Sequence, residues 1–138
     1  MENLKSCGAV IFFKGKKIEF LVLQYGLGHW DFPRGLMEKD EDEQETALRE
    51  IKEETEITDI KLNEKFKERT HFFFKNKTNL VKKEVIYFLA KTKSKDVKIS
   101  SEHLDYKWLN YEDALKQLTF KNTKEVLKKA DKFLKSLI

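Results

Sequence analysis

Three glutamates in one short segment, Glu50, Glu53 and Glu54, have the residue type and the spacing of ligands for a metal ion. On a helix, residues at i, i+3 and i+4 project from one face, so these carboxylates would lie together. Glu50 and Glu54 form a like-charge pair, which by itself destabilises a helix by about 0.2–0.5 kcal/mol. Arg49 offsets part of this repulsion. A hard divalent cation with oxygen ligands would reverse it, whereas a solvated acidic helix face is the alternative interpretation of this segment.

The residues around these glutamates extend the pattern. Gly35 is followed after five residues by Glu41, and Arg49 comes after seven more. The matching positions that follow are Glu50, Ile51, Glu53, Glu54 and Ile57. This order resembles the signature of the Nudix family, Gly-x5-Glu-x7-Arg-Glu-aliphatic-x-Glu-Glu-x-Gly-aliphatic, at eight of its nine defined positions. Glu56 departs from it by standing where the family usually has Gly, and a left-handed backbone there would cost about 1–2 kcal/mol.

The resemblance implies a fold and a type of reaction. The fold is α/β, an α/β/α sandwich with a mixed central sheet, in which the signature forms a loop–helix–loop and residues 1–138 form one domain. Nudix enzymes hydrolyse a nucleoside diphosphate linked to another group, with Mg²⁺ or Mn²⁺ as the metal ion. The implied metal ligands are Glu50, Glu53, Glu54 and the carbonyl group of Gly35. The implied catalytic residues are Glu53, Glu54, Arg49, which would orient a glutamate, and Glu102, which is either a base, a further ligand or a surface acid.

Three flanking segments resemble one subfamily, the asymmetrical diadenosine tetraphosphate hydrolases. Residues 29–35 are similar to its Trp-x-x-Pro-Lys-Gly segment, with Arg34 in place of the Lys. Residues 83–90 and 101–109 are similar to its late strands, so the resemblance covers most of the chain. The implied reaction is hydrolysis of diadenosine tetraphosphate to ATP and AMP. The alternatives are another Nudix substrate (5′-triphosphorylated RNA, a nucleotide sugar or a damaged nucleotide) and a module that senses a nucleotide without cleaving it.

The same resemblance implies residues that bind the substrate. Tyr87 would stack on adenine at an open face of the sheet, and Phe133 would stack from the other side, although Phe133 also fits the buried stripe of the last helix. Arg34 offers a bidentate donor for phosphate, or is a solvated cation in a turn. Lys83 matches a phosphate-binding lysine. Because neighbouring strand residues face opposite ways, Lys82 is the alternative.

Hydrophobic periodicity and turn residues indicate which elements hold these residues. Strands are expected at residues 5–13, 18–25, 72–74, 81–90, 97–99 and 106–109. The charged stretch 39–56 is expected to be a helix with a narrow buried face, made by Ala47, Leu48 and Ile51. Asn110 would cap a short helix, and Asn122 with Glu125 would cap the last one. The buried stripe of the last helix would consist of Val126, Ala130, Phe133 and Leu137.

Composition narrows the class of protein. The chain has 138 residues, a size that suits one domain, and its 40% of hydrophobic residues suffices for a core. Its single cysteine, Cys7, excludes an intrachain disulfide and a multi-cysteine zinc site. A net charge of +4 and a pI near 9.0 suit an anionic partner such as a nucleotide. The apolar run at residues 9–13 is too short to span a membrane. We therefore expect a cytoplasmic monomer that acts on a small nucleotide, with no membrane association and no stable nucleic-acid partner.

Overall fold

A computed structural model describes residues 2–137. Within them the chain forms a mixed sheet with the strand order β3-β2-β1-β6-β5, in which β4 pairs with β1 and β7 pairs with β2. The strands are β1 (Glu2–Lys14), β2 (Ile18–Tyr25), β3 (Trp30–Asp31), β4 (Arg34–Leu36), β5 (Lys61–Asn76), β6 (Asn79–Thr92) and β7 (His103–Leu109). β1 is parallel to β6, and the other pairs are antiparallel. The expectation of a mixed sheet is therefore confirmed.

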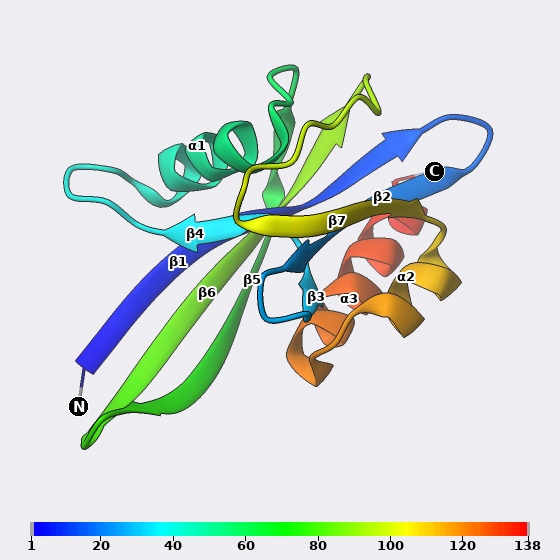
Figure 1. The fold of residues 1–138 in the computed structure, drawn as a ribbon. Coiled ribbons are helices and arrows are strands. Elements are labelled where there is room, and N and C mark those ends of the chain that lie inside the picture. The colour runs from blue at the N-terminus through cyan, green and yellow to red at the C-terminus, as the bar shows by residue number, and fades with distance from the viewer. Residues whose placement is uncertain (1, 138) are drawn as a thin grey trace.

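Helices cover both faces of the sheet (Figure 1). They are α1 (Glu43–Thr55), α2 (Tyr111–Gln117) and α3 (Lys121–Ser136). α1 packs on one face, where Ala47 and Ile51 join a core with apolar residues of the central strands. α2 and α3 pack on the opposite face, where Ala114, Val126 and Leu127 join a second core. The architecture is the expected α/β/α sandwich.

The two cores follow from the alternation of side chains along the central strands. On β6, Tyr87 and Leu89 lie in the core under α2 and α3, whereas Ile86 lies in the core under α1. Because side chains on a strand alternate between its faces, Lys83 lies on the α2/α3 side and Lys82 on the α1 side. The alternation therefore places Lys83, and not Lys82, on the same face of the sheet as Tyr87.

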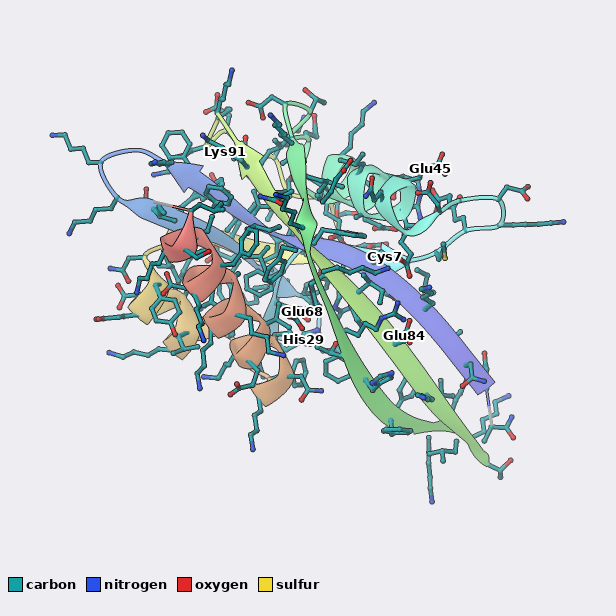
Figure 2. The ribbon with its side chains drawn as sticks, turned by 180° about the vertical axis from the view of Figure 1, so that it is seen from behind. Cys7, His29, Glu45, Glu68, Glu84 and Lys91 are labelled. Atoms are coloured by element: carbon teal, nitrogen blue, oxygen red, sulfur yellow. The ribbon has the colours of Figure 1, made fainter. Side chains whose placement is uncertain are left out.

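β5 and β6 form a long ribbon that extends past the helical layers, and Figure 2 shows Glu84 on this part of β6. The ribbon also helps to position α1. Glu43, at the start of α1, forms ion pairs of 2.5 Å with Lys5 of β1 and with Lys67 of β5. The two lysines therefore fix the first turn of α1 on the sheet.

Both ends of α1 are capped. Asp42 accepts a hydrogen bond from the Glu45 backbone (2.8 Å), and the Glu45 side chain accepts one from the Asp42 backbone (2.9 Å), which is a capping box. At the other end Glu56 has φ 59° and ψ 13°, and its N–H donates to the Lys52 carbonyl (2.9 Å). Glu56 therefore adopts the left-handed conformation considered above. The helix is shorter than the expected stretch 39–56.

Two of the expected local features are wrong. Residues 97–99 lie in an irregular segment, from which Val97 and Ile99 pack against the core under α1. Asn122 does not cap the last helix, because Phe120 occupies the N-cap position. The Asn122 amide instead donates to the backbone carbonyl of His71 (2.9 Å), and so joins α3 to β5.

The buried stripe of α3 also differs in part from the expectation. It consists of Thr123, Val126, Leu127, Ala130 and Leu134. Leu137 is 59% exposed, and Phe133 is only partly buried. None of the helices within residues 2–137 is long and apolar enough to cross a membrane.

Candidate active site

β4 brings Gly35 against the first of the three glutamates. β4 pairs with β1 so that Gly35 lies opposite Cys7. A Cβ atom built on Gly35 would overlap the carboxylate of Glu50. A side chain at position 35 would therefore displace the Glu50 carboxylate, and glycine lets the loop and the helix hold Gly35 and Glu50 together.

Arg49 links the acidic residues of the site. Its Nε and Nη2 donate to the two carboxylate oxygens of Glu41 (2.6 and 3.0 Å), and Nη2 also donates to the Leu36 carbonyl (2.9 Å). Its Nη1 donates to Glu50 (2.7 Å) and to Glu53 (3.2 Å). The hydrogen bond from Arg49 is the main cause that lowers the pKa of Glu41 to about 2. Arg49 thus orients two of the glutamates and holds the preceding loop through a third.

Glu54 is buried, with 4% of its surface exposed. Its Oε1 accepts a hydrogen bond from the backbone N–H of Arg34 (2.9 Å) and lies 3.3 Å from the hydroxyl of Tyr25. Its Oε2 lies 3.4 Å from Nε2 of His103. By contrast, 57% of the Glu53 side chain is exposed. Glu54 is therefore held on all sides, and Glu53 is the freer of the two.

The three glutamates suit a hard divalent cation. They offer only carboxylate oxygens, which are the donors that Mg²⁺ and Mn²⁺ prefer. Burial raises the pKa of Glu50, and the charges of Glu54 and Glu53 add to this effect, so a cation would relieve a real repulsion. Within residues 2–137, no group of three or more His, Cys, Asp or Glu side chains is already gathered around one point. A shared ion therefore requires the glutamate side chains to rearrange, and Glu53 is the most exposed of the three.

Tyr87 does not lie at an open face of the sheet, so the expectation that it stacks on adenine is wrong for this structure. Its side chain is 0% exposed and packs edge-on against Phe32, with ring centroids 5.9 Å apart. Its hydroxyl donates to the buried carboxylate of Asp31 (3.1 Å). Asp31 in turn accepts a hydrogen bond from Nε of Arg34 (2.9 Å). Tyr87 therefore positions Arg34 through Asp31 instead of contacting a base.

Lys83 lies near Arg34, on the side of the sheet that faces α2 and α3. Burial lowers the pKa of Lys83 to about 8, the positive charge of Arg34 adds to this effect, and Asp31 opposes it. Asp31 forms its ion pair with Arg34, so the ion pairs of the described residues leave Lys83 without a carboxylate of its own. The structure thus brings together Arg34 and Lys83, which the sequence analysis proposes as phosphate-binding residues.

Sequence reasoning missed a row of aromatic rings beside these cations. The rings of Tyr25 and His29 stack with centroids 5.1 Å apart, His29 lies 5.3 Å from Phe120, and Phe120 lies 5.7 Å from Phe72. The guanidinium of Arg34 lies over the Tyr25 ring at 5.1 Å. Every ring in the row is partly exposed. The rings come from β2 and its loop, β5 and the start of α3, so only the folded chain reveals the row.

Phe133, the other ring of the expected adenine clamp, lies away from this row near the end of α3. Its ring packs against Phe66 with centroids 5.6 Å apart, in a groove of about 370 Å³. Phe120 caps the start of α3 and Phe133 lies in its last turns, so the two are about 20 Å apart along the helix axis. A cavity of about 590 Å³ also adjoins the end of α3, and no proposed site residue lines it.

Glu102 lies exposed in the turn that precedes β7. Its backbone N–H lies 3.4 Å from Oγ of Ser100, and its carbonyl faces the loop at Gly26. The next residue, His103, is buried and faces Glu54. Glu102 is therefore at the rim of the site, one residue from a side chain inside it.

An α/β/α sandwich in which a glycine loop leads into a helix of oriented glutamates defines the Nudix class. The family described as NUDIX domain matches residues 4–130, and the chain belongs to this family. It is 37% identical over 144 residues to the asymmetrical bis(5′-nucleosyl)-tetraphosphatase of Mus musculus, with 95% of each chain covered. It is 39% identical over 137 residues to the Caenorhabditis elegans protein of that name, which covers 95% of this chain and 96% of the relative.

A solved structure agrees with this relationship. The binary complex of the C. elegans Ap4A hydrolase superposes with a TM-score of 0.86 at 37% identity. The match covers 96% of this chain and 98% of the other. The similarity therefore includes both faces of the sheet and all three helices.

Proposed function

We propose that the chain is a hydrolase that cleaves diadenosine tetraphosphate asymmetrically, to ATP and AMP, by attack of water on phosphorus. The observation that carries the proposal is the position of Arg34 on β4. Its backbone N–H is bound to Glu54, whereas its side chain lies with Lys83 and the aromatic row. The carboxylates suited to a metal and the groups suited to a nucleotide therefore meet at one residue. The names of the relatives specify a bis(5′-nucleosyl) tetraphosphate as their substrate.

The acidic side of the site would hold the metal, for which we propose Mg²⁺, with Mn²⁺ as the alternative. The ligands would be Glu50, Glu53, Glu54 and the Gly35 carbonyl. When bound, such an ion neutralises phosphate charge and lowers the pKa of a bound water. Arg49 would keep the carboxylates of Glu50 and Glu53 oriented before the metal ion binds. Glu102 at the rim and the exposed Glu53 are the two candidates for the base that accepts the proton of the attacking water.

The basic side of the site would hold the substrate. Asp31 binds Nε of Arg34 and so leaves its Nη groups for phosphate oxygens, next to the ammonium of Lys83. Charge-assisted hydrogen bonds of this kind are about twice as strong as neutral ones. Phe120 and His29, which are partly exposed, replace Tyr87 and Phe133 as the rings on which we propose that an adenine stacks. Stacking of a base on such a ring contributes about 1–3 kcal/mol.

Product analysis tests the proposed reaction. Diadenosine tetraphosphate is incubated with the protein and Mg²⁺ in ¹⁸O-labelled water, and the nucleotides are separated and weighed by mass spectrometry. We expect ATP and AMP in equal amounts, with the label in only one of them, because one P–O bond is cleaved by one water. Two molecules of ADP would show symmetrical cleavage and contradict the proposal. Turnover of 5′-triphosphorylated RNA without turnover of the dinucleotide would favour the alternative substrate.

We further propose that the protein acts as a cytoplasmic monomer without a stable nucleic-acid partner. The helices of a single chain cover both faces of the sheet, which supports a monomer. Cys7 is a buried free thiol, and free thiols are typical of reducing compartments. Light scattering of the purified protein, alone and with oligonucleotides, tests the monomer and the absence of a nucleic-acid complex.

A further inference from the structure

His103 is a buried side chain that lies between a turn and the acidic helix. It is 6% exposed, and its ring meets the Tyr25 ring edge-on at 4.5 Å. Its Nδ1 lies 2.8 Å from Oγ of Ser100, and its Nε2 lies 3.4 Å from Oε2 of Glu54. Among the described residues, Nε2 is one of only two buried side-chain polar atoms without a hydrogen-bond partner. A buried ring nitrogen in this position calls for a partner, and the carboxylate of Glu54 lies beside it without yet meeting hydrogen-bond geometry.

The hydrogen bonds around the ring indicate its tautomer. The backbone N–H of Glu102 points at Oγ of Ser100, 3.4 Å away, so this oxygen can accept there. With one lone pair occupied there, the Ser100 hydroxyl can donate its proton to Nδ1 of His103, 2.8 Å away, and we adopt this arrangement. A neutral imidazole that accepts at Nδ1 carries its proton on Nε2. That proton faces the carboxylate of Glu54.

We infer that His103 is a positioning residue that donates from Nε2 to Glu54 and thereby joins the turn with Glu102 to the metal-binding helix. The inference rests on the proposed metal-binding role of Glu54. Oε1 of Glu54 is already bound by the backbone of Arg34, so a bond from His103 to Oε2 fixes the remaining rotation of the carboxylate. In metal sites, hydrogen bonds to a ligand from outside the coordination sphere set its orientation, and their loss weakens metal binding about 10–100-fold.

The geometry also explains why a surface glutamate is held near the site. The turn at residues 100–103 is closed by the backbone hydrogen bond from His103 to the Ser100 carbonyl (3.1 Å). Glu102 lies inside this turn, and His103 is buried at its end. Anchoring His103 on Glu54 would therefore fix the backbone of Glu102 relative to α1.

The first test reads the tautomer directly. ¹⁵N chemical shifts of the His103 ring, assigned by comparison with His103→Gln, are measured in the metal-free protein. We expect a non-protonated Nδ1 and a protonated Nε2, and we expect Ser100→Ala to lose this preference while it keeps the ring in place. A protonated Nδ1, with or without a proton on Nε2, would overturn the inference.

The second test measures Mn²⁺ affinity by electron paramagnetic resonance, without substrate. His103→Leu keeps the volume and removes the donor, and should bind Mn²⁺ about 10–100-fold more weakly. His103→Gln places an amide N–H where Nε2 lies, and should restore most of the affinity. His71→Leu is the matched control, because His71 also lies beside a glutamate (3.5 Å from Glu84) but on the exposed ribbon, and its affinity should not change.

The possible results separate the inference from the proposed function. Equal Mn²⁺ affinity in wild type and His103→Leu would overturn the positioning role, even if the protein cleaves diadenosine tetraphosphate. A defect in His103→Gln as large as in His103→Leu would also overturn it, because the donor would then not matter. If His103→Leu fails to fold, Ser100→Ala carries the test, and unchanged affinity together with an unchanged tautomer would contradict the inference.

Discussion

Lys83 carries a charge that its surroundings make unfavourable. Burial and the guanidinium of Arg34 lower its pKa to about 8, so the ammonium form dominates near neutral pH and is lost in mildly alkaline solution. A polyphosphate should bind the protonated form, because only that form donates a charge-assisted hydrogen bond. We therefore expect the KM for diadenosine tetraphosphate to rise between about pH 7 and about pH 9. Steady-state kinetics at constant free metal measure this dependence.

Substitutions of Lys83 test whether its ammonium group causes this pH dependence of KM. Lys83→Arg stays charged and should flatten the pH profile, whereas Lys83→Met should raise KM about tenfold to a hundredfold even at neutral pH. Lys82→Met, on the opposite face of the sheet, is the matched control and should keep the wild-type profile. An unchanged alkaline rise of KM in Lys83→Met would show that another group titrates.

The lowered pKa of Lys83 also affects the stability of the protein without ligand. High pH should weaken substrate binding but should raise the free energy of unfolding. The folded-state pKa of Lys83 lies below its ordinary value of 10.5, so between the two values the unfolded chain binds more protons. The free energy of unfolding should therefore rise with pH through this interval. This contribution is complete above the unfolded value and is lost as the pH falls through about 8. Lys83→Met should abolish this part of the pH dependence in urea denaturation.

At the scale of residues, the sequence predicted what depends on spacing and missed what depends on burial. The placement of Glu50, Glu53 and Glu54 on one helix follows from helix periodicity, which is local. The burial of Tyr87 depends on Asp31 in β3 and on Phe32 directly after it, a segment that no local pattern places over β6. The Tyr87 hydroxyl has a polar partner, the carboxylate of Asp31, as a buried phenol requires.

At the scale of elements, the end of α1 carries backbone strain. Glu56 has a φ of 59°, a conformation that costs a residue with a side chain about 1–2 kcal/mol. Glu56→Gly should therefore stabilise the protein, by about 0.5–1 kcal/mol once the greater freedom of glycine in the unfolded chain is subtracted. We expect an increase in Tm of a few degrees, of order 3 °C, in thermal denaturation.

Glu56→Ala is the control for this substitution, because it removes the charge and keeps the side-chain strain. It should leave Tm near the wild-type value. Equal stabilisation by both variants would show that charge repulsion at the end of α1 is the cause. Lower stability of Glu56→Gly would show that flexibility outweighs strain at this cap.

The elements themselves were predictable where a pattern is long. Residues 18–25 form β2 with the expected bounds, and α1 occupies the interior of the expected helix. Short segments were not predictable, since residues 97–99 have the apolar type of a strand but find no neighbouring strand within the described residues. Asn122 is a residue type that often caps helices, yet its amide donates to the backbone carbonyl of His71 in β5. That contact joins segments far apart in the chain, so a local pattern does not reveal it.

At the scale of the whole molecule, the sheet separates two chemical tasks. α1 carries the carboxylates on one face, where Tyr25 also packs, and the other face carries Lys83 and the Phe72 and Phe120 end of the aromatic row, with β4 between them. Pairing of β4 with β1 places Gly35 towards α1 and Arg34 towards the other face. A substrate that binds along Arg34 would therefore bring its phosphates from the aromatic row to the glutamates.

This arrangement predicts different roles for the two phenylalanines of α3. Phe120→Leu should raise the KM for diadenosine tetraphosphate about tenfold, because a stacking surface of about 1–3 kcal/mol is lost, and should leave inhibition by inorganic tetraphosphate unchanged. Phe133→Leu, about 20 Å away along the helix, should change neither value and should lower Tm only slightly. Steady-state kinetics and competition with inorganic tetraphosphate measure both. If Phe133→Leu alone weakens binding, the adenine lies at the end of α3. If Phe120→Leu weakens both ligands equally, the base is held elsewhere on the row.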